Sequence, residues 1–176
     1  MLSLAVAAAF LATLGLAVPL RAETAPTPEA IASLVGDDVT VNGAASFNVV
    51  NGRSSALLAS GSEVTVRSGK ARIDLDADDT IAVCGPAHFT ILKAGGTITL
   101  ALDYGEVHPQ LNSGIALTIY MPLIVATPVA IGEAPRDLTV GLDQAGSLCI
   151  MTARGALRIE EELGGQGMLV PQGAPP

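Results

Sequence analysis

Two histidines and two carboxylates lie close together in the middle of this sequence, where they could support a metal site or acid–base catalysis. His88 and His108 flank Asp103 and Glu106, and zinc accepts imidazole and carboxylate ligands. The spacing of these four residues matches none of the short metalloenzyme motifs, however, and His88 alternates with apolar neighbours as in a strand. We therefore interpret both histidines as surface residues and expect no catalytic residue, no metal and no cofactor. An enzyme would require His88 to cluster with Asp103, Glu106 or His108 in the fold.

Cys84 and Cys149 are the only cysteines of the chain. In an exported chain, an even number of cysteines indicates one disulfide. That bond would close a loop of about 65 residues and contribute on the order of 4 kcal/mol. Both cysteines also lie in apolar, strand-like runs, where two separate buried thiols are the alternative. Neither has the polar surroundings that stabilise a thiolate, so neither is a candidate nucleophile.

Four aspartates, Asp74, Asp76, Asp78 and Asp79, form an acidic cluster at the end of an alternating segment. Carboxylates at this spacing are typical of a calcium-binding loop, which needs a glycine at its sixth position and a glutamate at its twelfth. Those positions hold Asp79 and Gly85 here. We therefore interpret the cluster as a solvated acidic edge that discourages strand-to-strand aggregation.

A strongly apolar stretch runs from Ile115 to Ala130 and is interrupted by Pro122 and Pro128. It is too short, and too often broken by proline, to cross a membrane as a helix. The stretch predicts two fully buried core strands that are joined at Met121-Pro122. The alternative is an apolar edge that a partner extends by adding a strand.

The segments that must position these residues have a hydrophobic period of two. Clean alternation covers residues 63–67, 71–75, 97–100 and 138–142. Turn signals separate the alternating segments, among them Asn51-Gly52, Gly85-Pro86, Gly95-Gly96 and Tyr104-Gly105, and the chain holds 19 glycines and 11 prolines. The sequence therefore predicts an all-β fold of many short strands with Gly-rich turns. The scarcity of aromatic residues, 3% of the chain, favours β-solenoid-like stacking, and a β-sandwich is the alternative.

The first 38 residues differ from the rest. Leu2 to Leu20 is almost wholly apolar and is followed by Arg21-Ala22-Glu23, which predicts a signal peptide over residues 1–22 with cleavage before Glu23. The alternative is an uncleaved anchor that holds the protein in the inner membrane through Met1 to Leu20. Residues 23–38 are predicted to form a linker and one short helix from Pro28 to Val35, because Thr27 resembles an N-cap. The tail, residues 171–176, is expected to be disordered.

The charge balance restricts the class of partner. The chain carries 17 acidic and nine basic residues, a formal net charge of −8. A protein that binds duplex DNA or RNA needs a basic surface to neutralise phosphates. Nucleic acid is therefore excluded as an expected partner.

Several motifs, taken in order, resemble a known family. They are Gly61 to Leu75 (GSEVTVRSGKARIDL), Thr80 to Ile91 (TIAVCGPAHFTI), Ile98 to Val107 (ITLALDYGEV), Ala126 to Ile131 (ATPVAI) and the close from Ala156-Leu-Arg-Ile to Gln166-Gly-Met-Leu-Val. Together they resemble the FecR domain of bacterial envelope proteins, over residues 39–170.

The resemblance implies a periplasmic or secreted β-rich domain that acts through protein contacts. We therefore expect an exported, non-catalytic FecR-like module that binds a protein or a cell-envelope polymer. The alternative is a component of an envelope signalling system that acts beside a separate sigma-factor regulator.

Overall fold

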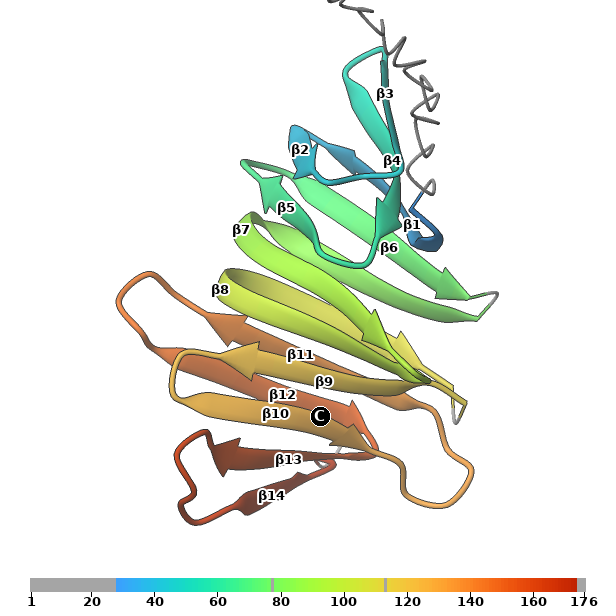
Figure 1. The fold of residues 1–176 in the computed structure, drawn as a ribbon. Helices are drawn as coiled ribbons and strands as arrows, with labels where there is room; N and C mark the ends of the chain where they lie inside the picture. Colours follow the sequence, from blue (N-terminus) through green and yellow to red (C-terminus); the bar gives the residue numbers. More distant parts are fainter. Residues whose placement is uncertain (1–27, 77, 113, 174–176) are drawn as a thin grey trace, which may run out of the picture.

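The computed structural model describes residues 28–76, 78–112 and 114–173 and shows an all-β fold (Figure 1). Fourteen strands belong to one open, mostly antiparallel sheet, and the described residues contain no helix. The strands are β1 (Ala30–Asp37), β2 (Val39–Asn42), β3 (Ser46–Val50), β4 (Arg53–Ala59), β5 (Ser62–Val66), β6 (Lys70–Asp76), β7 (Asp79–Ala94), β8 (Thr97–Leu111), β9 (Ala116–Met121), β10 (Ile124–Val129), β11 (Arg136–Leu142), β12 (Leu148–Arg154), β13 (Ala156–Glu161) and β14 (Met168–Pro171).

The long hairpin of β7 and β8 is the centre of the fold, because each of its strands belongs to two layers. The first half of β7 pairs with β6, and its second half pairs with β5. The second half of β8 pairs with β11, and its first half pairs with β9 in the one parallel pairing of the described strands. The sheet therefore branches on both sides of this hairpin.

The branches form two layers that share β7 and β8. We call the series β3-β4-β1-β6-β7-β8-β11-β12 layer one and the series β2-β5-β7-β8-β9-β10-β13-β14 layer two. A single cluster of buried residues includes Leu34 of layer one and Val64 of layer two. The Ser54 hydroxyl in β4 also donates to the Val39 carbonyl in β2 at 3.1 Å. The layers therefore enclose a common core.

Glycine allows the hairpin to pass from one layer to the other. The pairing of β7 with β8 shifts between Cys84 and His88, on either side of Gly85-Pro86. On the facing strand, Gly105 has a φ of 118° and lies against Ala87. A β-carbon at Gly105 would collide with that neighbour, so the bend depends on glycine.

The predicted solenoid is wrong. A solenoid stacks successive coils in parallel, whereas nearly all neighbouring strands here are antiparallel. Two separate sheets, as in the alternative β-sandwich, are not formed either, because β7 and β8 join the two layers into one hydrogen-bonded network. The all-β class is confirmed, and most strands are short, but β7 and β8 are 16 and 15 residues long.

The predicted helix from Pro28 to Val35 is also wrong, because Ala30–Asp37 forms β1. Ala32, Leu34 and Gly36 alternate into the core, and β1 pairs with β4 on one side and with β6 on the other. Backbone hydrogen bonds on both edges and burial of one face outweigh the N-cap signal of a short segment. Thr27, the signal segment and the rest of the linker lie outside the described residues.

The apolar stretch from Ile115 to Ala130 forms β9 and β10, which turn at Pro122-Leu123. Both strands are interior strands of layer two, and their side chains alternate between buried and more exposed positions. The two predicted strands are thus confirmed, but their full burial is wrong, because Tyr120 is 43% exposed. The alternative of an apolar edge is also wrong. In the described part of the chain, no helix is long and apolar enough to cross a membrane.

The expected disordered tail is ordered at its start. Pro171 belongs to β14, and the Gly173 N–H donates to the Thr152 carbonyl of β12 at 3.0 Å. Residues 174–176 lie outside the described residues.

Candidate functional site

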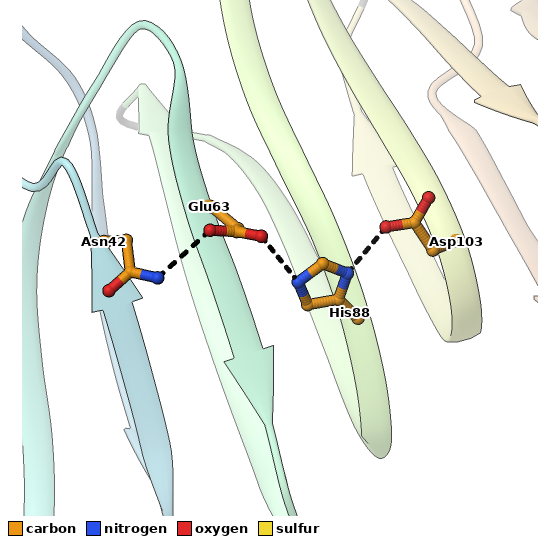
Figure 2. Close-up of polar contacts among 4 residues, drawn as sticks. All are labelled: Asn42, Glu63, His88 and Asp103. Atoms are coloured by element: carbon orange, nitrogen blue, oxygen red, sulfur yellow. Dashed lines mark hydrogen bonds and ion pairs between the residues drawn. The ribbon is translucent and has the colours of Figure 1, made fainter.

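A line of four polar side chains crosses the outer surface of layer two (Figure 2). It joins Asn42 of β2, Glu63 of β5, His88 of β7 and Asp103 of β8. The Asn42 amide donates to Glu63 Oε2 at 3.0 Å, and the two nitrogens of His88 contact Glu63 Oε1 at 3.0 Å and Asp103 Oδ2 at 2.6 Å. The His88 ring also stacks on Tyr104, with ring centroids 6.0 Å apart. The His88 imidazole is therefore held by two carboxylates and one aromatic ring, all from strands next to β7.

This line is poorly suited to acid–base catalysis. A general base must offer a free nitrogen to the substrate, whereas a carboxylate occupies each nitrogen of His88. Within the described residues, no group of three or more histidine, cysteine, aspartate or glutamate side chains is arranged to hold a metal ion. The arrangement instead links four strands at the bend of the central hairpin.

The hydrogen bond from Asn42, followed by that from His88, lowers the pKa of Glu63 from its ordinary value of 4.5. A carboxyl group whose pKa falls on folding stabilises the folded state above its unfolded pKa, and this contribution disappears as the pH falls through the folded pKa. When the pH is lowered from about 5 to about 3, we therefore expect the free energy of unfolding to fall less in Glu63→Gln than in the wild type.

Urea unfolding at a series of pH values measures this difference. Glu162→Gln is the control, because Glu162 is an exposed turn residue outside the polar line. Parallel pH profiles for the wild type and Glu63→Gln would contradict the prediction.

The four residues considered as a zinc site do not come together. His88 meets Asp103, but His108 instead contacts Asp137 Oδ1 of β11 at 2.6 Å through Nε2. Glu106 lies on the outer surface of layer one, opposite Cys84 in the register of β7 and β8. Of the clustering that an enzyme would require, the structure contains only the pair of His88 and Asp103.

The aspartate cluster is not arranged as a calcium loop. Asp79 is buried, and its Oδ1 accepts the Asn112 N–H at 2.5 Å. Asp74 forms an ion pair with Arg72 on the same strand at 2.6 Å. The expectation of solvated carboxylates is therefore wrong for Asp79. The expectation of a sheet edge is also wrong, because β6 is an interior strand between β7 and β1.

An open groove of about 560 Å³ lies between the bend of the central hairpin and the β11–β12 hairpin. Tyr104 and Leu148 contribute apolar surface, Glu106 contributes a carboxylate, and Cys84 and Cys149 contribute thiols. This volume is in the range of small-molecule and peptide-side-chain sites. The groove therefore combines apolar surface, negative charge and two thiols in one place.

The turn from Asp143 to Ser147 forms one wall of the groove. Asp143 Oδ1 accepts the N–H groups of Ala145 and Ser147, each at 2.8 Å. Hydrogen bonds from the turn, with those of Ser147 the largest, hold the pKa of Asp143 below its ordinary value. The carboxylate thus fixes the shape of this wall.

The two cysteines are free thiols in the structure. Cys84 pairs with Glu106, Glu106 with Gly141, and Gly141 with Cys149, so the cysteines end a row that crosses four neighbouring strands. Three strand spacings correspond to about 14 Å along the sheet, whereas a disulfide needs α-carbons within about 7 Å. This register does not support a disulfide between them. The alternative predicted two separate buried thiols. The thiols are separate, but neither is buried, because Cys149 is exposed and Cys84 is half-buried.

Sequence reasoning did not identify Asn42, Glu63 or Asp137. Glu63 belongs to an alternating segment, which predicted that its side chain lies on an outer face but not that β5 pairs with β7. The partner of each histidine depends on which distant strands are neighbours, and the period of two carries no such information.

No family model matches the chain, and neither a curated protein nor a solved structure is significantly similar to it, so the resemblance to the FecR domain stays a prediction.

Proposed function

We propose that this protein is an exported, FecR-like binding module that holds a protein or a cell-envelope polymer in the groove between the central hairpin and the β11–β12 hairpin. The groove carries this proposal because it places apolar contact area beside the Glu106 carboxylate on a rigid all-β support. A site of this kind recognises a partner through contact area and hydrogen bonds and needs no reacting group. The engaged nitrogens of His88 also favour a non-catalytic role.

The experiment places a photocrosslinking amino acid at one position of the protein in its native bacterial envelope. Leu148 lies in the groove and is 39% exposed, and Leu92 on β7 is 40% exposed but does not line the groove. The two positions therefore differ in location and not in accessibility. We expect a discrete crosslinked adduct from Leu148 and none of the same mass from Leu92.

Reversing the charge at one position of the groove with Glu106→Lys should lower the yield of the Leu148 adduct several-fold, because the partner would lose a favourable polar contact. The adduct should also protect Cys149 from a maleimide reagent, which otherwise reacts with this exposed thiol without prior reduction. Equal adducts from Leu148 and Leu92, or a yield that Glu106→Lys does not change, would contradict the groove as the binding site.

Export is a separate part of the proposal. An intact mass that begins at Glu23 would support it, whereas a mass that retains Met1 would indicate the membrane-anchored form.

A further inference from the structure

The two layers are offset from each other. Layer one extends further from the central hairpin at one end of the molecule, and layer two extends further at the other end. Toward β3, layer one continues beyond the central hairpin by β6, β1, β4 and β3, whereas layer two continues by β5 and β2. At the other end, layer two continues by β9, β10, β13 and β14, and layer one by β11 and β12. Figure 1 shows the two ends of this stack, with β3 at the top and β14 at the bottom. Each end therefore has an overhang, formed by opposite layers. The core faces of β4 and β13 are buried, so only the outermost strand, β3 at one end and β14 at the other, projects past the other layer.

The last strand of each overhang carries apolar side chains on the face that continues the core. Phe47 and Val49 of β3 pair with the buried residues Ala56 and Ser54, yet they are themselves 41% and 58% exposed. Met168 of β14 pairs with the buried Ile159 and is 62% exposed. The core face thus extends past its cover at both ends of the molecule.

The outermost strands also lack the charges that usually protect a sheet edge. Strands β2, β3 and β14 contain no charged residue, and the only charge in β12 is Arg154 at its end. This is notable in a chain with 17 acidic residues, because proteins commonly place charges on edge strands to prevent pairing with other strands. Proline, which also protects sheet edges, occurs once in these four strands, as Pro171 at the last position of β14.

From these features we infer that the protein binds a second copy of itself head to tail, through a lap joint between the two overhangs. Both layers contain eight strands, so a second copy continues both layers at once. In layer one, β12 of one copy lies beside β3 of the next, and in layer two β14 lies beside β2. The apolar strip of β3 then covers that of β14.

The strand directions permit this joint. Every pairing in layer one is antiparallel, so its two outermost strands run in opposite directions and β12 meets β3 as an antiparallel neighbour. Layer two includes the parallel pair of β8 and β9, so β14 meets β2 as a parallel neighbour. Gly173 already occupies the Thr152 carbonyl, which leaves residues 148–151 of β12 for β3.

The expected affinity is modest. Each new strand pair is four residues or about 13 Å long, and with the apolar strips the joint buries on the order of 1,000 Å², near the lower limit of a specific interface. Association should therefore become visible in the range of about 10 to 200 µM. Because the two surfaces of a head-to-tail contact differ, assembly continues beyond the dimer.

Sedimentation velocity on the purified protein tests the joint, with one variant that blocks each end. Val49→Lys places a charge on the β3 strip and Met168→Lys places one on the β14 strip, and both positions are already exposed. We expect the weight-average mass of the wild type to rise at least threefold over this concentration range, whereas each variant alone stays monomeric. An equal mixture of the two variants should stop at the dimer, because each variant keeps one intact end.

Leu163→Lys is the control, since Leu163 is highly exposed in the turn between β13 and β14. This variant should assemble like the wild type, and urea unfolding should show that all three variants remain folded. A wild type that stays monomeric at about 200 µM would overturn the inference. So would assembly that Val49→Lys abolishes and Met168→Lys leaves intact, because that result indicates symmetric pairing of β3 with itself. Residues 148–151 of β12 belong to the joint, and Leu148 also lines the groove. A Leu148 adduct with the mass of two copies of this chain therefore reports the joint, whereas an adduct of another mass that persists in Val49→Lys reports a different partner in the groove.

Discussion

Replacing Gly105 with alanine should lower the free energy of unfolding by about 3–5 kcal/mol, a large fraction of the stability of an ordinary domain. A β-carbon at this position would lie 2.3 Å from Ala87 Cβ and 2.7 Å from Ala87 Cα. The second of these contacts is with the main chain of β7, so no side-chain rotation relieves it. The φ of 118° adds strain of its own, because residues with a β-carbon rarely adopt this conformation.

The matched control is Gly96→Ala in the turn of the same hairpin. Nothing lies within 4 Å of a β-carbon built at Gly96, and its φ is not in the range that favours glycine. Urea unfolding should therefore place Gly96→Ala within about 0.5 kcal/mol of the wild type. If Gly105→Ala were equally stable, the close contact between β8 and β7 at the bend would be incorrect.

The position of this bend shows what the sequence could and could not predict. Residues 63–67, 71–75, 97–100 and 138–142 were predicted as strand segments from their alternation, and all fall in or at the end of strands β5, β6, β8 and β11. By contrast, Gly85-Pro86 and Tyr104-Gly105 resembled turns that end strands. In the structure, both lie inside the two longest strands, at the point where these pass between the layers.

Local sequence does not distinguish a turn from a bend within a strand, since both need glycine and the outcome depends on what pairs on either side. The same limit applies to the polar line. Its residues come from β2, β5, β7 and β8, and only the register of those strands brings Glu63 and Asp103 to opposite sides of His88. Composition led to the expectation that nucleic acid is not a partner, which stays a prediction, but it could not place the groove, which two distant hairpins form together.

Replacing Arg136 with methionine should also be strongly destabilising, by about 3–5 kcal/mol. Arg136 is buried at the start of β11, where its Nη2 donates to the Ile115 carbonyl at 2.7 Å and to the Asn112 carbonyl. Burial lowers the pKa of Arg136, and the negative charge of the buried Asp79 opposes this effect. Methionine preserves most of the volume, so the loss reports the missing hydrogen bonds and counter-charge and not a cavity.

The second substitution Asp79→Asn separates these two contributions. In the Arg136→Met background, Asp79 is a buried carboxylate without its nearby cation, whereas asparagine keeps an oxygen that can accept the Asn112 N–H and carries no charge. We therefore expect Asp79→Asn to destabilise the wild type but to restore about 1–2 kcal/mol in the Arg136→Met variant, as measured by a double-mutant cycle in urea. Strictly additive losses would mean that Arg136 acts only by closing the loop between β8 and β9 through its two carbonyl contacts. A restored stability would instead show that the carboxylate and the guanidinium are retained as a buried pair, in which each group makes the burial of the other tolerable.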